Sequence, residues 1–379
     1  MTELDDISWD ELAQSIADGE AVLLLGPDAI PLYSTQGQPS DDVDATTSFS
    51  KLSRNRIMQT LSEKELNHFY ERDNLFQFSS APAKQKAMKE VRNVLREDAW
   101  LPDSELLRQI VAIPFPVVVN INPDKYVYEA FLKYYREPQF DYFTSKDKPN
   151  PPVLDFPDGM NKPLVYNLCG SVLDKLDSVI LDYFDLFELL KNILADQGVS
   201  EHLTRKLQEA DRFILLGFEL ERWYFQLFLH YLNKLDYNPF NSAKQNFPIV
   251  SWISDASREF VMYQFKIKHI APTRQGFESL YQACERKGIL RKLHEPGSKI
   301  ETDIRLLAVQ NKFEEAFNLL ETHLGEEERT IELPHLRSRF AAWLVAKKAG
   351  TEDNNYLSLE INRIRYTLLT YANQIRQEE

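Results

Sequence analysis

Short runs of consecutive apolar residues, each ending at a glycine or a polar turn, recur along the first three quarters of the chain. A strand that is covered on both faces reads as such a run, because neither face meets water. The runs alternate with segments whose apolar residues recur at helical spacing, and this alternation is typical of a parallel sheet. The predicted strands are residues 21–25, 115–121, 164–168 and 213–216, with further candidates at 248–253 and 268–270.

Capping and turn residues mark where several of the intervening helices begin or end. Ser8 and Glu11 have the spacing of a capping box, Pro123 stands at a plausible first helical position, and Gly288 is a C-cap. The pattern therefore predicts an α/β, Rossmann-like fold: a parallel sheet with helices on both faces. The predicted helices are residues 9–19, 49–70, 83–97, 103–111, 124–135, 183–194, 221–232 and 277–287.

Beyond residue 294 the strand pattern stops. Residues 294–299 (HEPGSK) are typical of a linker, and four helical segments follow, which predict a small all-α bundle. We therefore expect an α/β domain over 1–294, a linker at 295–298 and a helical domain over 299–379. Polar residues 33–50, with the acidic cluster 41–44, predict a long loop over the strand ends, and residues 146–163 predict a surface loop. The predicted tail helices are 300–310, 313–324, 333–348 and 353–375.

Composition narrows the classes of function. The chain has 379 residues, 43% of them hydrophobic, and a net charge of −14, which argues against a protein that binds the nucleic-acid backbone. Only two cysteines, Cys169 and Cys284, are present, and the seven histidines lack metal-ligand spacing, so we expect neither a disulfide framework nor a metal site. No apolar run is long enough to span a membrane, and the N-terminus lacks the pattern of a signal peptide. We expect a cytoplasmic protein that does not enter membranes.

Four strand ends, taken together and in order, resemble the sirtuin-like domain. The segments are LLLGPDAI, VVNINPDKYVYEAF, LVYNLCGSV and FILLGFELERW, which match the family's GAGxS, TTNYD, LHGS and LGFSL motifs. The chain is most similar to the divergent branch found in prokaryotic defence proteins, which includes NAD-hydrolysing effectors, and it lacks the cysteines of the zinc-containing deacylases. The resemblance implies a nicotinamide-nucleotide fold whose ligand would be NAD or ADP-ribose.

The tail resembles the effector-associated domains of prokaryotic conflict systems. The segments concerned are NKFEEAFNLLETHL and LEINRIRYTLLTYANQI. The resemblance implies a protein partner that bears a similar helical domain and binds residues 299–379. A homo-oligomer is the other assembly that we consider.

The loop after the first strand departs from the family's pattern. Only Gly26 remains of its glycines, Pro27 has no N–H to donate, and Asp28 places a carboxylate where the family has a glycine. Asp28 has a simpler interpretation as a turn residue or helix N-cap. Either way, the loop holds phosphate less well than the family's loop does.

Asn122 and Asp124 match the residues that position the nicotinamide and its ribose in the family. The alternative is that they only cap the helix that follows. Cys169 stands where the family has its catalytic histidine, and a thiol is a poor proton acceptor at neutral pH unless a cation lowers its pKa. Cys169 is therefore either a small buried thiol, which we favour, or a thiolate nucleophile.

The remaining positions that would surround a cofactor follow the third and fourth strands. They are Gly170, Ser171 and Gly217, with Glu219 in place of the family's serine. Glu219 adds a negative charge to the rim, or is simply an acid in the first turn of a helix. Arg222 and Trp223 are interpreted as packing at the start of that helix.

Four departures from the family, at Pro27, Asp28, Cys169 and Glu219, all weaken NAD binding or turnover. We therefore expect a catalytically degenerate sirtuin-like protein without a bound cofactor. It would act as a binding, assembly or sensor component of a prokaryotic antiviral system. The alternative is an NAD-hydrolysing effector that a partner activates, with Asn122, Asp124 and Cys169 as its catalytic candidates.

Overall fold

The structure is a computed structural model of the whole chain. It describes residues 8–35, 46–97, 99–135, 138–144, 162–194, 201–234, 245–250, 253–265, 267, 270–293, 299–323, 332–349 and 354–375. The fold and the site below are built from these residues.

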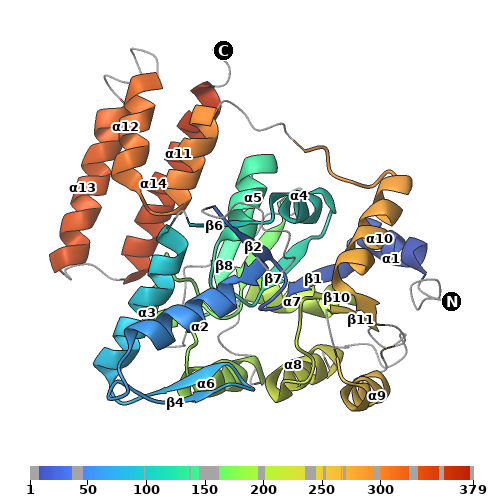
Figure 1. The fold of residues 1–379 in the computed structure, drawn as a ribbon. Coiled ribbons are helices and arrows are strands. Elements are labelled where there is room, and N and C mark those ends of the chain that lie inside the picture. The colour runs from blue at the N-terminus through green and yellow to red at the C-terminus, as the bar shows by residue number, and fades with distance from the viewer. Residues whose placement is uncertain are drawn as a thin grey trace.

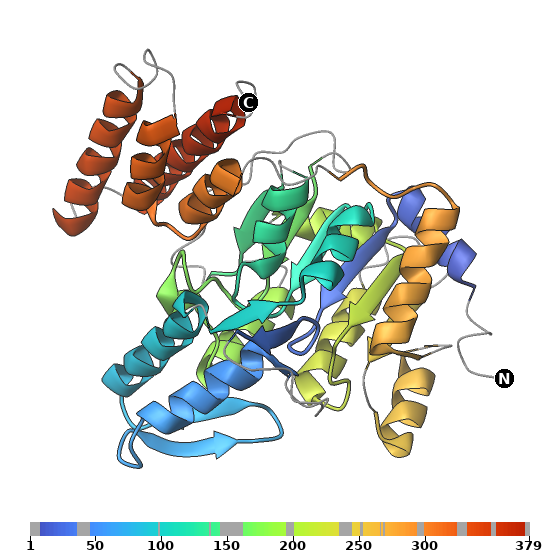
Figure 2. The same ribbon diagram turned by 45° about the horizontal axis from the view of Figure 1, so that its top comes forward.

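A parallel sheet forms the centre of the molecule (Figures 1 and 2). Strand β1, which comes from the first apolar run, pairs with β10 on one side and β7 on the other, so it occupies the middle of the sheet. Each of the other neighbouring pairs is also parallel. The seven strands lie in the order β12 (Ala271–Pro272), β11 (Gln245–Val250), β10 (Arg212–Leu216), β1 (Ala21–Leu25), β7 (Val117–Asn120), β9 (Leu164–Asn167) and β8 (Gln139–Tyr142).

Alternate residues of β1 point to opposite faces of the sheet, and each face has its own core. Leu23 and Leu25 pack among helices α1 (Trp9–Ala17), α4 (Ser104–Ala112), α5 (Tyr126–Tyr134) and α10 (Thr273–Arg286). Val22 and Leu24 pack among α6 (Tyr183–Leu194), α7 (Glu201–Glu209), α8 (Trp223–Lys234) and α9 (Asp255–Gln264). Because both faces are covered, every residue of β1 is buried, as the apolar run predicts.

A separate subdomain is inserted between β1 and β7. It has a core of its own, which α2, α3 and the hairpin β4–β5 share with residues 172–181. We call this insertion the cap, defined as residues 31–35 and 46–102, position 98 excepted. Its elements are β2 (Pro31–Ser34), β3 (Thr46–Ser48), α2 (Phe49–Thr60), β4 (Leu66–Tyr70), β5 (Leu75–Phe78), α3 (Ala81–Arg96) and β6 (Trp100–Pro102).

The tail forms a helical bundle that packs on the α/β domain. Its core draws on all four of its helices. The bundle meets the α/β domain through α11 on α5. It also meets the segment after β9, where Asn311 Nδ2 donates to the Leu173 carbonyl (2.8 Å) and Arg365 lies 3.5 Å from Asp174. In Figures 1 and 2 the bundle stands at one end of the molecule, with α13 on its outer side. The helices are α11 (Lys299–Val309), α12 (Phe313–His323), α13 (Leu333–Ala349) and α14 (Asn354–Ile375).

The predicted fold class is confirmed: a parallel sheet with helices on both faces, followed by a helical bundle. Several local predictions are wrong. The predicted helix 49–70 ends at Thr60, since the Ser62 N–H and hydroxyl both bond to Glu65 in a turn that leads into β4. The predicted loop 33–50 contains part of β2, all of β3 and the start of α2.

The predicted helix start at Trp9 is confirmed, but the capping box predicted there and the helix start predicted at Pro123 are wrong. Ser8 precedes α1 but makes no capping hydrogen bond through its side chain. Pro123 is not the first helical residue, because α5 begins at Tyr126. The predicted linker 295–298, the acidic cluster 41–44 and most of the surface loop 146–163 lie outside the described residues.

Candidate functional site

The turn after β1 is closed by hydrogen bonds within the chain. The Gly26 N–H donates to the Leu216 carbonyl (2.8 Å), and the Asp28 N–H points to the Gly217 carbonyl (3.4 Å). The Ala29 N–H donates to the Gly26 carbonyl (3.2 Å), which makes a tight turn with Pro27 at the position that proline favours. The next element is strand β2 and not a helix. The backbone donors that a phosphate-binding loop needs are therefore already engaged, and no helix N-terminus follows them directly.

Gly26 and Gly217 are required by the contact between two turns. A Cβ on Gly26 would lie 2.3 Å from the Gly217 carbonyl oxygen. Gly217 has a φ of +70°, and a Cβ there would lie 2.4 Å from the Cα of Ala29. The turns after β1 and β10 thus touch through their backbones, where an open doubly wound sheet has a crevice for ligands.

The two acidic residues of the predicted rim both have cationic neighbours. The Asp28 carboxylate accepts from the Ser48 hydroxyl (2.6 Å) and lies 3.5 Å from Lys51 Nζ. Glu219 lies 2.7 Å from the Arg222 guanidinium. Their charges are therefore balanced locally.

Asn122 and Asp124 leave the end of β7 in different directions. Asn122 Nδ2 donates to the Pro27 carbonyl (3.0 Å), so this side chain joins the ends of β7 and β1 while it lines a cavity. Asp124 is fully buried, accepts from the Tyr126 N–H (3.0 Å) and is not among the residues that line the cavity. Burial raises the pKa of Asp124 to about 7.

Cys169, at the end of β9, lines the same cavity as Asn122. Burial raises the pKa of its thiol to about 12, so the thiol is protonated at neutral pH. Gly170 and Ser171 lie outside the cavity lining. Gly170 has a φ of +89° and packs against Ser178, and the Ser171 hydroxyl donates to Asp174 (2.6 Å). Of the nine predicted site residues, only Asn122 and Cys169 reach the cavity.

The cavity lies between the cap and the carboxyl ends of β1, β7, β9 and β10. Its volume is about 960 Å³, with open solvent at its mouth included. Most of its lining is apolar and comes from α2, α6, α8, the hairpin β4–β5 and the segment after β9. A concave, mostly apolar site with a few polar groups is the usual form of a small-molecule site.

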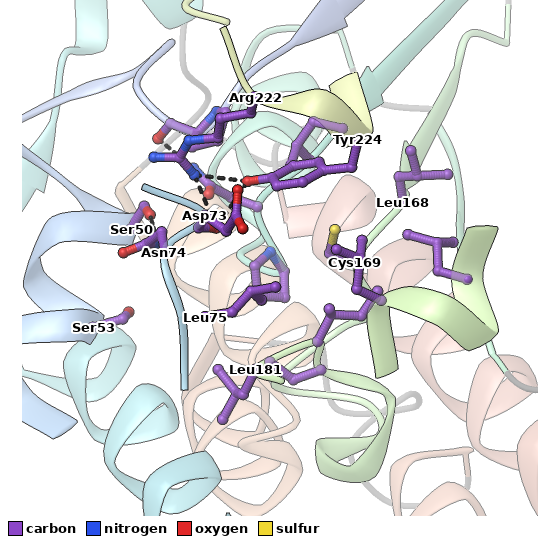
Figure 3. Close-up of a pocket in the computed structure, with 18 of the residues that line it drawn as sticks. Ser50, Ser53, Asp73, Asn74, Leu75, Leu168, Cys169, Leu181, Arg222 and Tyr224 are labelled. Atoms are coloured by element: carbon purple, nitrogen blue, oxygen red, sulfur yellow. Dashed lines mark hydrogen bonds between the residues drawn. The ribbon is translucent and has the colours of Figure 1, made fainter. Parts of the chain in front are cut away.

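One polar wall of the cavity is built where α8 meets the hairpin turn between β4 and β5. Arg222 Nη1 donates to the Tyr224 hydroxyl (2.8 Å), and that hydroxyl donates to the Asp73 carbonyl (3.0 Å). Asn74, next in the turn, has a φ of +54°, and its Nδ2 donates to the Ser50 hydroxyl (2.9 Å). Figure 3 shows this cluster, with the side chains of Asp73 and Asn74 beside Arg222 and Tyr224. The turn is therefore fixed in place from two sides.

Sequence reasoning misses this polar wall. It interprets Arg222 as packing, and it does not single out Asp73 and Asn74, because it extends one helix over residues 49–70. The available signal was ERDN, Glu71 to Asn74, which is a polar turn sequence between two aromatic, strand-like segments.

The described residues contain no cluster of three or more histidine, cysteine or acidic side chains placed to hold a metal. Within the same part of the chain, no helix combines the length and the apolar character that crossing a bilayer requires. In comparisons with known proteins, no protein-family model matches the chain, and no curated protein matches it either.

Proposed function

We propose that this chain is a catalytically degenerate sirtuin-like protein that acts by binding. It would serve as an assembly or sensor component of a prokaryotic antiviral system, and its helical C-terminal domain would recruit the partner. The motifs at the four strand ends suggest the family. Cys169 at the histidine position and the hydrogen-bonded turn after β1 support the loss of catalytic activity.

One observation carries this proposal: the cavity residue at the catalytic histidine position is a protonated thiol. Deprotonating a ribose hydroxyl needs an acceptor with a pKa near the working pH. Cys169 has a pKa of about 12, raised by burial. Asp124 has a pKa of about 7 but does not line the cavity. Neither residue therefore supplies the proton acceptor that the sirtuin reaction needs.

The engaged turn after β1 supports the same proposal. A dinucleotide needs backbone N–H groups for its diphosphate, and the Gly26 and Ala29 N–H groups donate to carbonyls of the chain. Binding a diphosphate there would require breaking these bonds and separating Gly26 from Gly217.

The helical bundle supports recruitment of a protein partner. Its α11 side packs on α5, whereas α13 lies on the side away from the α/β domain (Figure 1). Val345, on α13, is 68% exposed. An exposed helix face is a common form of protein docking site. We therefore place the partner on α13.

The decisive experiment is incubation of the purified full-length protein with NAD, followed by measurement of free nicotinamide. We expect no release above that of a heat-denatured control, with or without the partner protein. Turnover that is lost in Asn122→Ala would contradict the proposal.

The second candidate function is partner-activated hydrolysis of NAD. It is favoured by one observation, that Asn122 and Cys169 both line a cavity at the strand ends. If it holds, nicotinamide release should appear on addition of the partner and should disappear in Cys169→Ala. Calorimetric titration with NAD and ADP-ribose distinguishes a sensor that binds without turnover from a protein that only assembles.

A further inference from the structure

Three buried polar atoms in the cavity wall have no hydrogen-bond partner among the residues that the structure describes. They are Oγ of Ser53 on α2, and Oδ1 of both Asp73 and Asn74 in the hairpin turn. Ser53 is only 7% exposed. Buried polar groups are paired in the great majority of native structures, so three unpaired atoms in one cavity wall need an explanation. A molecule in the cavity that bonds to them supplies one.

The chemistry of these atoms defines their missing partner. A carboxylate oxygen and an amide oxygen only accept hydrogen bonds, and a serine hydroxyl both accepts and donates. The missing groups are therefore hydrogen-bond donors, such as hydroxyl or amino groups.

The charges of the wall favour an uncharged ligand. Arg222 is already paired with Glu219. This leaves Arg54 and Asp73, one cation and one anion, among the lining residues. With one charge of each sign, this part of the lining has no net charge to compensate an ionic ligand, so a neutral molecule has the smaller desolvation cost.

Apolar side chains line most of the rest of the cavity. Figure 3 shows Ser50, Ser53 and Asn74 on one side of the cavity, and Leu168 and Cys169 on the other. Leucine and isoleucine side chains of α6 complete the apolar part: Leu186, Leu189, Leu190 and Ile193. Filling such a space with an apolar group is favourable in proportion to the area removed from water.

We propose that the cavity binds an uncharged amphiphile, with an aliphatic body against α6 and a donor-bearing head on Ser53, Asp73 and Asn74. The proposal rests on the proposed function in one respect, that the site binds without turnover. It differs from a dinucleotide site because it uses neither the turn after β1 nor any group that would hold a diphosphate.

The test uses 1,2-octanediol as the probe and titrates it into the full-length protein by calorimetry. The matched control is 1,2-dimethoxyoctane, which keeps both oxygens and the chain but has no donors. We expect the diol to bind at least about fivefold more tightly than the ether, since about one net hydrogen bond separates them. Octanoate, with an anionic head, should bind more weakly than the diol.

Variants connect the binding to the named atoms. Ser53→Ala should weaken the diol about fivefold, leave the ether unchanged, and keep or raise the melting temperature of the free protein, because it removes an unpaired buried hydroxyl. A purely structural Ser53 would lower the melting temperature. Ser15→Ala, on α1 outside the cavity, is the matched control and should change neither quantity.

Equal affinity for the diol and the ether would overturn the proposal, as would tighter binding of octanoate or no binding of the diol. The nicotinamide assay measures the proposed function separately. Turnover of NAD with normal diol binding would contradict the proposed function alone, and loss of diol selectivity without turnover would contradict this inference alone.

Discussion

Two places lie side by side at the carboxyl edge of the same sheet, and they differ in how their polar groups are satisfied. Where the turns after β1 and β10 meet, backbone N–H groups donate to carbonyls of the chain and the glycines leave no room for a Cβ. In the neighbouring cavity, under the cap, there is space, and Ser53, Asp73 and Asn74 each have an unpaired buried oxygen. At the first place the chain itself supplies the hydrogen-bond partners, whereas in the cavity the described residues leave three oxygens without one.

This difference teaches that the strand ends that resemble the sirtuin-like motifs are not the part of this edge that has room for a ligand. Gly26 and Gly217 belong to the segments that resemble the sirtuin-like domain, but their observed role is to pack two turns together. The unpaired oxygens lie in the cap and belong to none of those segments. Substitutions at each of the two places, followed by stability measurements, test this difference.

The largest expected effect is at Gly217. Gly217→Ala should lower the free energy of unfolding by more than about 3 kcal/mol, because the new Cβ would meet the Ala29 backbone at 2.4 Å. Gly288 has nearly the same φ, +69°, but a Cβ there would have nothing within 4 Å. Gly288→Ala should therefore cost only about 1 kcal/mol. Urea denaturation measures both, and equal losses would mean that the turns are not in tight contact.

The next effect depends on pH and concerns Asp124. Its pKa is about 7 in the folded protein, raised by burial, and near 3.8 when unfolded. The folded state therefore binds more protons between these values, and stability falls as the pH rises from about 4 to about 7. Asp124→Asn keeps an acceptor for the Tyr126 N–H and has no charge to bury.

We therefore expect Asp124→Asn to be more stable than the native protein at pH 7.5, on the order of 4 kcal/mol, with the gain vanishing near pH 4. Thermal unfolding across this pH range measures the gain. If the gain does not vary with pH, burial does not raise the pKa of Asp124 in the folded protein.

A third pair of variants compares the open cavity with a filled core. Leu181 lines the cavity. Leu280 belongs to α10 and lies in the packed core between this helix and the sheet. Leu280→Phe should cost about 1–3 kcal/mol through overpacking, whereas Leu181→Phe should cost less than about 1 kcal/mol or stabilise, since its ring can enter empty space. Chemical denaturation distinguishes the two, and equal costs would mean that the cavity offers no space.

The smallest expected effect is at the hydrogen-bonded part of the cavity wall. Tyr224→Phe removes the hydroxyl that joins Arg222 to the Asp73 carbonyl, and should cost about 1 kcal/mol. Tyr263 is 88% exposed, so Tyr263→Phe is a control expected to change nothing measurable. If both variants are neutral in thermal unfolding, the hairpin turn is held in place by other contacts.

Long buried strands and strongly periodic helices were predictable from the sequence. The apolar run of β1 and the spacing in α6 both lie within the predicted elements, because burial on both faces or on one helical face leaves a clear pattern. Strands β4 and β5 were missed, since β4 is half exposed and its Leu-Asn-His-Phe-Tyr sequence has no clear alternation. Helices α7 and α9 were missed as well.

The cavity could not be predicted, because its walls come from segments far apart in the sequence. Ser53 and Cys169 are separated by more than a hundred positions and meet only because the cap folds back over the strand ends. The sequence motifs predicted two residues on one side of this cavity, Asn122 and Cys169. The other side depends on the placement of a hairpin turn that local patterns do not encode.

Asp174 connects the bundle to the segments that follow β7 and β9. Its carboxylate accepts from Lys125 Nζ (2.8 Å), which belongs to the segment between β7 and α5, and it also faces Arg365 of α14. Burial acts to raise the pKa of Asp174, but Lys125 and Arg365 hold it below its ordinary value. A partner that displaces α14 must therefore separate this anion from one of its two counter-charges, close to Ser171 and the end of β9.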